Sequence, residues 1–120
     1  MSKSIDYYLT PTSPWTYLGH ERFAQIAARH GAAVAVKPVD YGIIFPQSGG
    51  LPLAKRAPQR QAYRLAELAR WREFLGVPLN LQPKFFPVDG TSAACVICAA
   101  PEGKRMALAA DFLRAVWAEE

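Results

Sequence analysis

Ser13 is the residue best placed to do chemistry in this chain. With Pro14 it lies between a stretch typical of a strand and a stretch typical of a helix. Ser13 has the character of an N-cap residue, because proline follows it at the first helical position. A hydroxyl at that point lies over the unpaired N–H groups of the helix, where these donors and the helix dipole favour an anion. From the local pattern alone, simple helix capping is the favoured role and anion binding is the alternative.

A second candidate is the pair Cys95 and Cys98, which has C-x-x-C spacing. A thioredoxin-like redox site needs its first cysteine at a helix N-terminus after a strand, where the dipole lowers the thiol pKa. Here small and apolar residues flank the pair on both sides, as they do inside an apolar helix. We therefore predict buried, reduced, structural cysteines. No histidine stands near them, so a zinc site is not expected, and we predict no metal.

The two histidines, His20 and His30, fall on one expected helix without a recognisable ligand or nucleophile partner. We predict that both are solvated. A serine hydrolase centred on Ser13 is disfavoured, because the stretch lacks a G-x-S-x-G elbow and no histidine is placed to act as its base.

Two cations and an aromatic side chain complete the set of candidates. Lys55 and Arg56 follow a Gly- and Pro-rich segment, and Phe85 lies in a second extended segment. The sequence pattern alone indicates only that Ser13 caps a helix, that Lys55 and Arg56 are surface cations, and that Phe85 belongs to a hydrophobic hinge.

The elements that must position these residues begin with a strand over 5–9, a helix from Pro14 to about His30 and a second strand over 33–39. Gly31 suits the end of that helix. A strand, a helix and a strand within so short a span form a right-handed crossover unit, so the sheet is expected to be parallel.

The remainder of the chain is expected to be mostly helical. The pattern predicts a long loop over 41–53, a helix over 58–75, an extended loop over 79–87, a helix starting near Asp89 or Thr91 and running through Ala100, and a last helix over 103–117. The fold class is therefore α/β, with two strands followed by a helical block.

Composition bounds the class of protein. The 120 residues allow one domain, and 51% of them are apolar, which is typical of a globular chain. The net charge of +4 is not gathered into a basic stripe, so we expect no nucleic-acid partner. No stretch is long and apolar enough to span a bilayer, and the N-terminus lacks a signal-peptide core, so no membrane association and a cytoplasmic location are expected.

Several short motifs resemble one family. The stretches Asp6-Tyr7-Tyr8 and Ser13-Pro14-Trp15-Thr16-Tyr17-Leu18 resemble the start of 2-hydroxychromene-2-carboxylate isomerases and of the related kappa-class glutathione transferases. The likeness continues through Tyr63-Arg64, Ala69-Arg70-Trp71, Gly76-Val77-Pro78 and the closing Val116-Trp117-Ala118-Glu119-Glu120. It therefore covers nearly the whole chain.

The resemblance implies a thioredoxin-like fold of the DsbA and kappa type. Residues 1–40 would form the βαβ half and residues 41–120 a loop with an inserted helical subdomain. The C-terminal ββα half of the family is expected to be missing. A homodimer is expected, and an inactive truncated domain that self-associates is the non-enzymatic alternative.

The resemblance also implies a function. It makes Ser13 the catalytic residue that stabilises the thiolate of the cofactor glutathione, with Pro14 and Trp15 beside it. The reaction would be isomerisation of a 2-hydroxychromene-2-carboxylate-type intermediate of aromatic degradation, and a kappa-class glutathione transferase is the alternative. Lys55 and Arg56 would contact the aromatic carboxylate substrate. Phe85 falls near a family tyrosine, and the lost hydroxyl suggests a changed substrate. A disulfide oxidoreductase is disfavoured, because residues 10–13 contain no cysteine.

Overall fold

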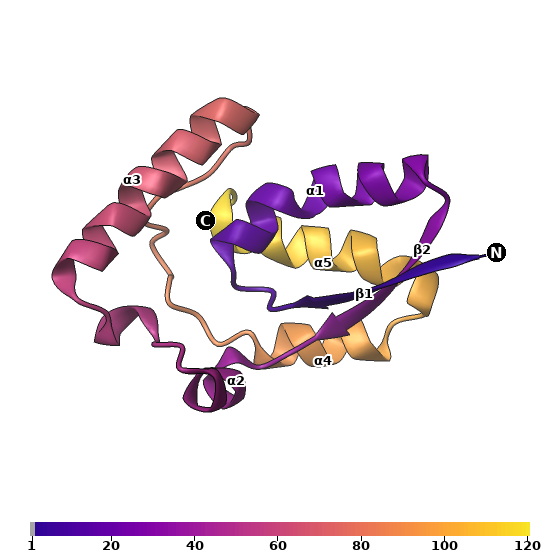
Figure 1. The fold of residues 1–120 in the computed structure, drawn as a ribbon, viewed down its shortest axis with the longest axis horizontal. Helices are drawn as coiled ribbons and strands as arrows, with labels where there is room; N and C mark the ends of the chain where they lie inside the picture. The colour runs from indigo at the N-terminus through magenta and orange to yellow at the C-terminus, as the bar shows by residue number, and fades with distance from the viewer. Residues whose placement is uncertain (1) are drawn as a thin grey trace.

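The computed structural model describes residues 2–120 and shows a small parallel sheet packed against helices (Figure 1). In chain order the elements are β1 (Lys3–Leu9), α1 (Pro14–Arg29), β2 (Ala32–Pro38), α2 (Tyr41–Ser48), a 3-10 turn η1 (Leu53–Lys55), α3 (Pro58–Leu75), α4 (Thr91–Ala99) and α5 (Glu102–Trp117). Both strands and four of the helices agree with the sequence prediction to within two residues at nearly every boundary.

The strands β1 and β2 form a parallel pair in the described part of the chain, with Lys3 opposite Ala32 and Leu9 opposite Pro38. Helix α1 makes the crossover between them. It begins with proline at its first turn, and Gly31 after its end has a φ of +61°, a left-handed conformation that favours glycine. The predicted βαβ unit is confirmed.

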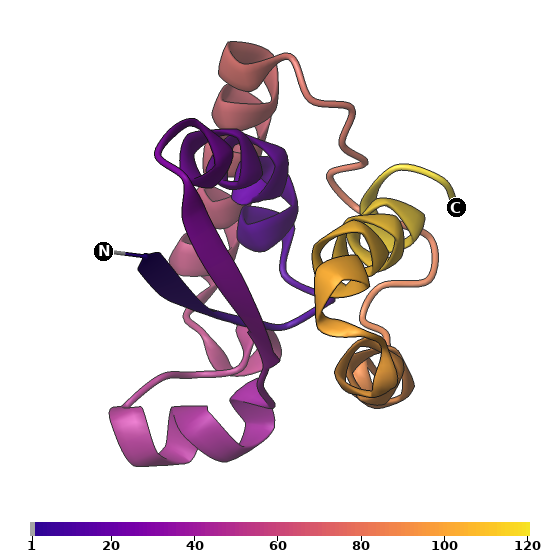
Figure 2. The same ribbon diagram turned by 90° about the vertical axis from the view of Figure 1, so that its right-hand side faces the viewer.

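The sheet buries one face. Leu9 and Val36 are buried against Ile97 of α4 and Ala109 of α5, and Tyr7 packs against this cluster. The opposite face is polar: Lys37 Nζ lies 2.8 Å from an Asp6 carboxylate oxygen and 5.4 Å from the ring centroid of Tyr8, and these side chains are exposed. Figure 2 shows both strands on one side of α4 and α5.

A second core cluster joins α1 to α3. Leu18, Leu68, Leu79 and Trp117 are buried together, so that α1, α3, the connection after α3 and the end of α5 meet at one place. Residues 79–90 form the larger part of the connection between α3 and α4 and are called the 79–90 connection below. The Asn80 N–H donates to the Trp117 carbonyl oxygen at 2.7 Å, which holds the start of this connection against α5. This cluster sets the position of α3 relative to the N-terminus of α1.

The prediction that His20 is solvated is wrong, whereas His30 is exposed as predicted. His20 is 5% exposed and joins three elements, with Nδ1 3.1 Å from the Tyr7 hydroxyl of β1 and Nε2 2.9 Å from the Met106 carbonyl oxygen of α5. Because a carbonyl can only accept, Nε2 carries the proton and Nδ1 accepts from Tyr7. A polar residue with two partners fits a buried site that the helix pattern alone does not reveal.

The prediction of a continuous loop over 41–53 is also wrong. Asp40 caps α2 by accepting the Gly42 N–H at 2.7 Å, and Gly49 ends the helix with a φ of +75°. Pro46 lies inside this helix, and none of its residues is buried. Of the Gly and Pro residues that suggested a loop, Gly42 and Pro46 therefore lie within the helix, and Gly49 ends it. Among residues 2–120, no helix combines the length and apolar character that a membrane span needs.

Candidate functional site

Ser13 caps α1, as the sequence predicts. Its Oγ accepts the Thr16 N–H at 3.2 Å, and its own N–H donates to the Thr10 carbonyl oxygen at 3.3 Å across a tight turn. A hydroxyl has one proton to donate and two lone pairs. One lone pair is used by Thr16, and the proton has no acceptor among residues 2–120. Ser13 thus offers a free donor at the positive end of a 16-residue helix.

The two residues after Ser13 lie in the first turn of α1. Pro14 is buried and has no N–H, so it can shape this position but cannot donate to a ligand. Trp15 is 40% exposed, and its backbone N–H lies in the first turn of the helix, where no intrahelical acceptor exists. The structure therefore places the three residues together and leaves Ser13 and Trp15 as the groups able to donate.

A cavity of about 800 Å³ opens where both strands end. Its wall comes from the turn over 10–12, from residues 38–42 after β2, and from the 88–91 segment with α4. Gly90 lets these parts approach closely, because a Cβ there would lie 2.8 Å from Thr12 Cγ2. In open α/β sheets, ligands bind at the carboxyl ends of the strands. Ser13 follows this wall directly in the chain but does not line it.

The prediction that Cys95 and Cys98 are buried is wrong. Both are exposed free thiols, and both line this cavity. Helix α4 is apolar nearly all round, but the sheet and α5 cover only a narrow side of it, so Ile97 is its one buried residue. The cysteines are on the uncovered sides. They lie inside the helix and not at its N-terminus, where a thioredoxin-type nucleophile is placed.

The predicted substrate residues line neither the cavity at the strand ends nor the smaller cavity described next. Lys55 is exposed at the end of η1, and Arg56 is partly buried with its Nε donating to the Leu51 carbonyl oxygen at 2.9 Å. Phe85 is 66% exposed, with Lys84 Nζ 5.3 Å from its ring centroid. Its neighbour Phe86 turns the other way, into the protein.

Phe86 belongs to a second, smaller cavity of about 300 Å³ between α3 and the 79–90 connection. Arg64 of α3 lines this cavity as well. Sequence reasoning missed both as site residues, since α3 carries several arginines and the two phenylalanines are adjacent. Only the tertiary structure distinguishes Arg64 from the other arginines of α3. Arg64 is partly buried, whereas Arg60, Arg70 and Arg72 are exposed.

Comparison with known proteins decides the family. The model of the DsbA-like thioredoxin domain matches residues 4–120. This chain belongs to that family. The resemblance predicted from short motifs is thereby confirmed, and so is the thioredoxin-like fold class.

Named relatives of this DsbA-like domain fall in two groups. A 2-hydroxychromene-2-carboxylate isomerase of Sphingobium xenophagum is 28% identical over 95 residues, which cover 78% of this chain and 49% of that protein. A Pseudomonas putida protein of the same name is 24% identical over 119 residues, covering 96% and 56%. Glutathione S-transferase kappa 1 of Caenorhabditis elegans is 29% identical over 82 residues, covering 68% and 36%. The chain spans about half the length of the curated relatives it matches.

A solved structure supports the fold. A selenomethionine-labelled 2-hydroxychromene-2-carboxylate isomerase superposes with a TM-score of 0.76 and 23% sequence identity, over 97% of this chain and 57% of that one. At this identity the likeness concerns the fold. Together the comparisons place the DsbA-like domain among relatives that are named as isomerases and glutathione transferases.

Proposed function

We propose that this DsbA-like domain serves a glutathione-dependent isomerisation of 2-hydroxychromene-2-carboxylate-type compounds, with Ser13 as the residue that stabilises the glutathione thiolate. The observation that carries the proposal is the hydroxyl of Ser13. It accepts from the Thr16 N–H and keeps its own proton free of any acceptor in the described part of the chain. The names of the two isomerase relatives support the choice of reaction.

The residues at the start of α1 fit a thiolate. An anionic sulfur would accept the free proton of Ser13 and lie at the positive end of the helix dipole. The exposed Trp15 supplies a first-turn N–H and an indole ring beside it. When bound, glutathione would supply the thiolate that adds reversibly to the substrate and is released unchanged. Only the thiolate is a good nucleophile, so holding it ionised is the contribution of Ser13.

The substrate side of the proposal relies on cations. Lys55 and Arg56 give positive charge between α2 and α3, and a carboxylate is the group such cations bind. Lys55 is exposed and unpaired among residues 2–120, which leaves its ammonium group available. Phe85 is exposed enough to cover an aromatic ring from the outside.

The alternative function is a kappa-type glutathione transferase, which the match to glutathione S-transferase kappa 1 favours. Ser13 would have the same role in both reactions. The two differ in what happens to the thiol, because a transferase consumes glutathione in a conjugate, whereas an isomerase returns it.

The test uses the 120-residue chain with a 2-hydroxychromene-2-carboxylate and with an aryl halide in parallel. We expect wild type to isomerise the chromene without net loss of thiol. In Ser13→Ala the isomerisation rate should fall by about 10- to 1,000-fold, the range for losing one positioned hydrogen-bond donor. Ser13→Thr, which keeps a hydroxyl, is the matched control and should retain most of the rate. Equal rates in wild type and Ser13→Ala would refute the role of Ser13. Conjugation of the halide without isomerisation would favour the transferase.

A further inference from the structure

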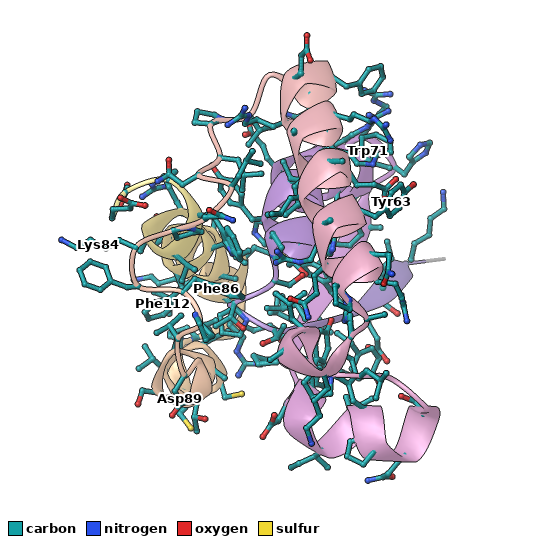
Figure 3. The ribbon with its side chains drawn as sticks, turned by 90° about the vertical axis from the view of Figure 1, so that its left-hand side faces the viewer. Tyr63, Trp71, Lys84, Phe86, Asp89 and Phe112 are labelled. Carbon is teal, nitrogen blue, oxygen red and sulfur yellow. The ribbon has the colours of Figure 1, made fainter. Side chains whose placement is uncertain are left out.

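Helix α3 carries exposed aromatic side chains on a side that no other described element covers. Tyr63 and Trp71 are exposed, and Phe74 is 75% exposed. Figure 3 shows Tyr63 and Trp71 on the same side of α3, and Figure 1 shows this helix at the outer edge of the molecule. Leu68, on a different side of the helix, is fully buried against α1 and α5. Exposed apolar side chains gathered in this way mark a surface that binds a partner.

The exposed side of α3 has the residue spacing of a helix that pairs with another helix. Tyr63, Glu67, Arg70 and Phe74 follow one another at intervals of four, three and four residues, which is the a and d spacing of a paired helix. Trp71 lies beside them, and its ring centroid is 5.7 Å from that of Phe74 at an interplanar angle of 86°. We call these five residues the α3 seam.

The side chains of the α3 seam are partly held in place before any partner binds. The Tyr63 hydroxyl donates to Glu67 Oε1 at 3.0 Å, and the rings of Trp71 and Phe74 meet edge to face. Side chains that are already ordered lose less entropy when they enter an interface. The seam therefore resembles a prepared contact surface more than a set of freely moving side chains.

The two charges of the α3 seam have no ionic partner within the described part of the chain. Glu67 and Arg70 lie three residues apart on one helix, yet neither forms an ion pair with the other or with any further residue among 2–120. Both groups are thus available to a partner that carries the opposite charges at the same spacing.

We propose that the α3 seam binds the α3 seam of a second copy of this chain, with the two helices antiparallel. A two-fold axis that passes between positions 68 and 69 places Tyr63 opposite the partner's Phe74, and Glu67 opposite the partner's Arg70. The symmetry repeats each contact, so the pair gains two aromatic contacts and two ion pairs. A parallel pair would instead place Glu67 beside the partner's Glu67, and this repulsion disfavours it.

The seam complements itself, which favours a second copy over an unrelated partner. Its aromatic side chains are already partly covered, so the contact buries less than the roughly 1,600 Å² of a standard interface. We therefore expect reversible association with a dissociation constant on the order of micromolar. The contact involves neither Ser13 nor glutathione.

The experiment is sedimentation equilibrium of the 120-residue chain as wild type, as Glu67→Arg and as Arg70→Glu. Each charge reversal places like charges opposite each other at both ion-pair positions, so the dissociation constant of the dimer should rise at least about tenfold. An equimolar mixture of the two variants has opposite charges at both positions again and should dimerise nearly as well as wild type.

Glu102→Arg is the matched control. It makes the same charge change at an exposed position at the start of α5, which lies at the other end of the molecule from α3 (Figure 1). Its dissociation constant should equal that of wild type.

Three results would overturn the proposal: a wild type that stays monomeric at all concentrations, a dissociation constant unchanged in either charge reversal, or a loss of dimer that mixing does not restore. The second result would assign self-association to another surface, such as the unpaired edges of β1 and β2. Recovery on mixing also shows that the variants are folded. Because the measurement contains no glutathione and no substrate, failure here and failure of the Ser13 proposal are distinguishable.

Discussion

Replacing His20 by alanine tests the packing that holds the first helix against the sheet. His20 is 5% exposed and hydrogen-bonds Tyr7 of β1 and Met106 of α5. The variant loses both bonds, leaves the half-buried Tyr7 hydroxyl without its acceptor and opens a space the size of an imidazole. Adding the lost hydrogen bonds, an unsatisfied half-buried donor and a small cavity gives about 2–4 kcal/mol of lost unfolding free energy.

The same residue predicts the direction of a pH effect. Burial lowers the pKa of His20 below 6.5, so the folded chain binds its proton less readily than the unfolded chain does. The contribution of neutral His20 is fully present above the unfolded pKa and is lost as the pH falls through the folded pKa. One group of this kind lowers the unfolding free energy by at most about 1.4 kcal/mol per pH unit across that window.

Urea denaturation followed by circular dichroism, in a series of buffers from neutral to mildly acidic pH, measures both effects. His20→Ala should lower the unfolding free energy and flatten its pH slope, whereas His30→Ala, at an exposed position, is the control and should leave the unfolding free energy at neutral pH almost unchanged. A destabilisation in His20→Ala below about 0.5 kcal/mol, the size of an ordinary surface substitution, would show that His20 does not hold α1 against the sheet. So would a pH slope unchanged by its loss.

Three further predictions follow from burial and strand pairing. Cys95 and Cys98 are exposed, so a thiol reagent should modify both in the folded protein; protection until unfolding would contradict the structure. Leu68 is fully buried, so Leu68→Ala should cost about 2–5 kcal/mol in urea denaturation, while Leu51→Ala, at an exposed position, should cost far less. The outer edges of β1 and β2 have no strand partner among residues 2–120, so light scattering should show a mass above that of the monomer; a monomer at all concentrations would exclude the expected homodimer.

Local signals made part of the fold predictable. Proline at the start of α3 and Gly76 just after its end, in the left-handed conformation, fix this helix at both ends, and its predicted bounds are those observed. Ser13 and Pro14 fixed the start of α1 in the same way, and Gly31 fixed its end. Chemistry that depends on one turn of chain can be recognised in sequence, because the interacting groups are close neighbours.

Burial could not be predicted in the same way. An apolar helix such as α4 suggests burial on all sides, yet how much of it is covered depends on the elements packed against it, which left both cysteines exposed. The role of His20 depends on a carbonyl oxygen 86 residues away. Arg64 is set apart from the other arginines of α3 only by the aromatic rings that α5 and the 79–90 connection bring to it. These features arise from tertiary contacts with no local sequence signal.

Helix capping by Ser13 can be separated from its proposed stabilisation of a bound thiolate with two variants. Ser13→Asp keeps a side-chain acceptor at the N-cap but replaces the hydroxyl, with its free proton, by a negative charge. Ser13→Ala removes the capping acceptor and the hydroxyl proton together. Loss of the cap should cost Ser13→Ala about 1 kcal/mol of unfolding free energy, and Ser13→Asp much less.

The most direct measurement is a pH titration of glutathione bound to the chain, following the ultraviolet absorbance of its thiolate. We expect wild type to lower the thiol pKa of bound glutathione below its value in free solution, and Ser13→Ala and Ser13→Asp both to raise it towards or above that value. A bound thiol pKa that is the same in wild type and both variants would contradict the claim and leave Ser13 as a helix cap.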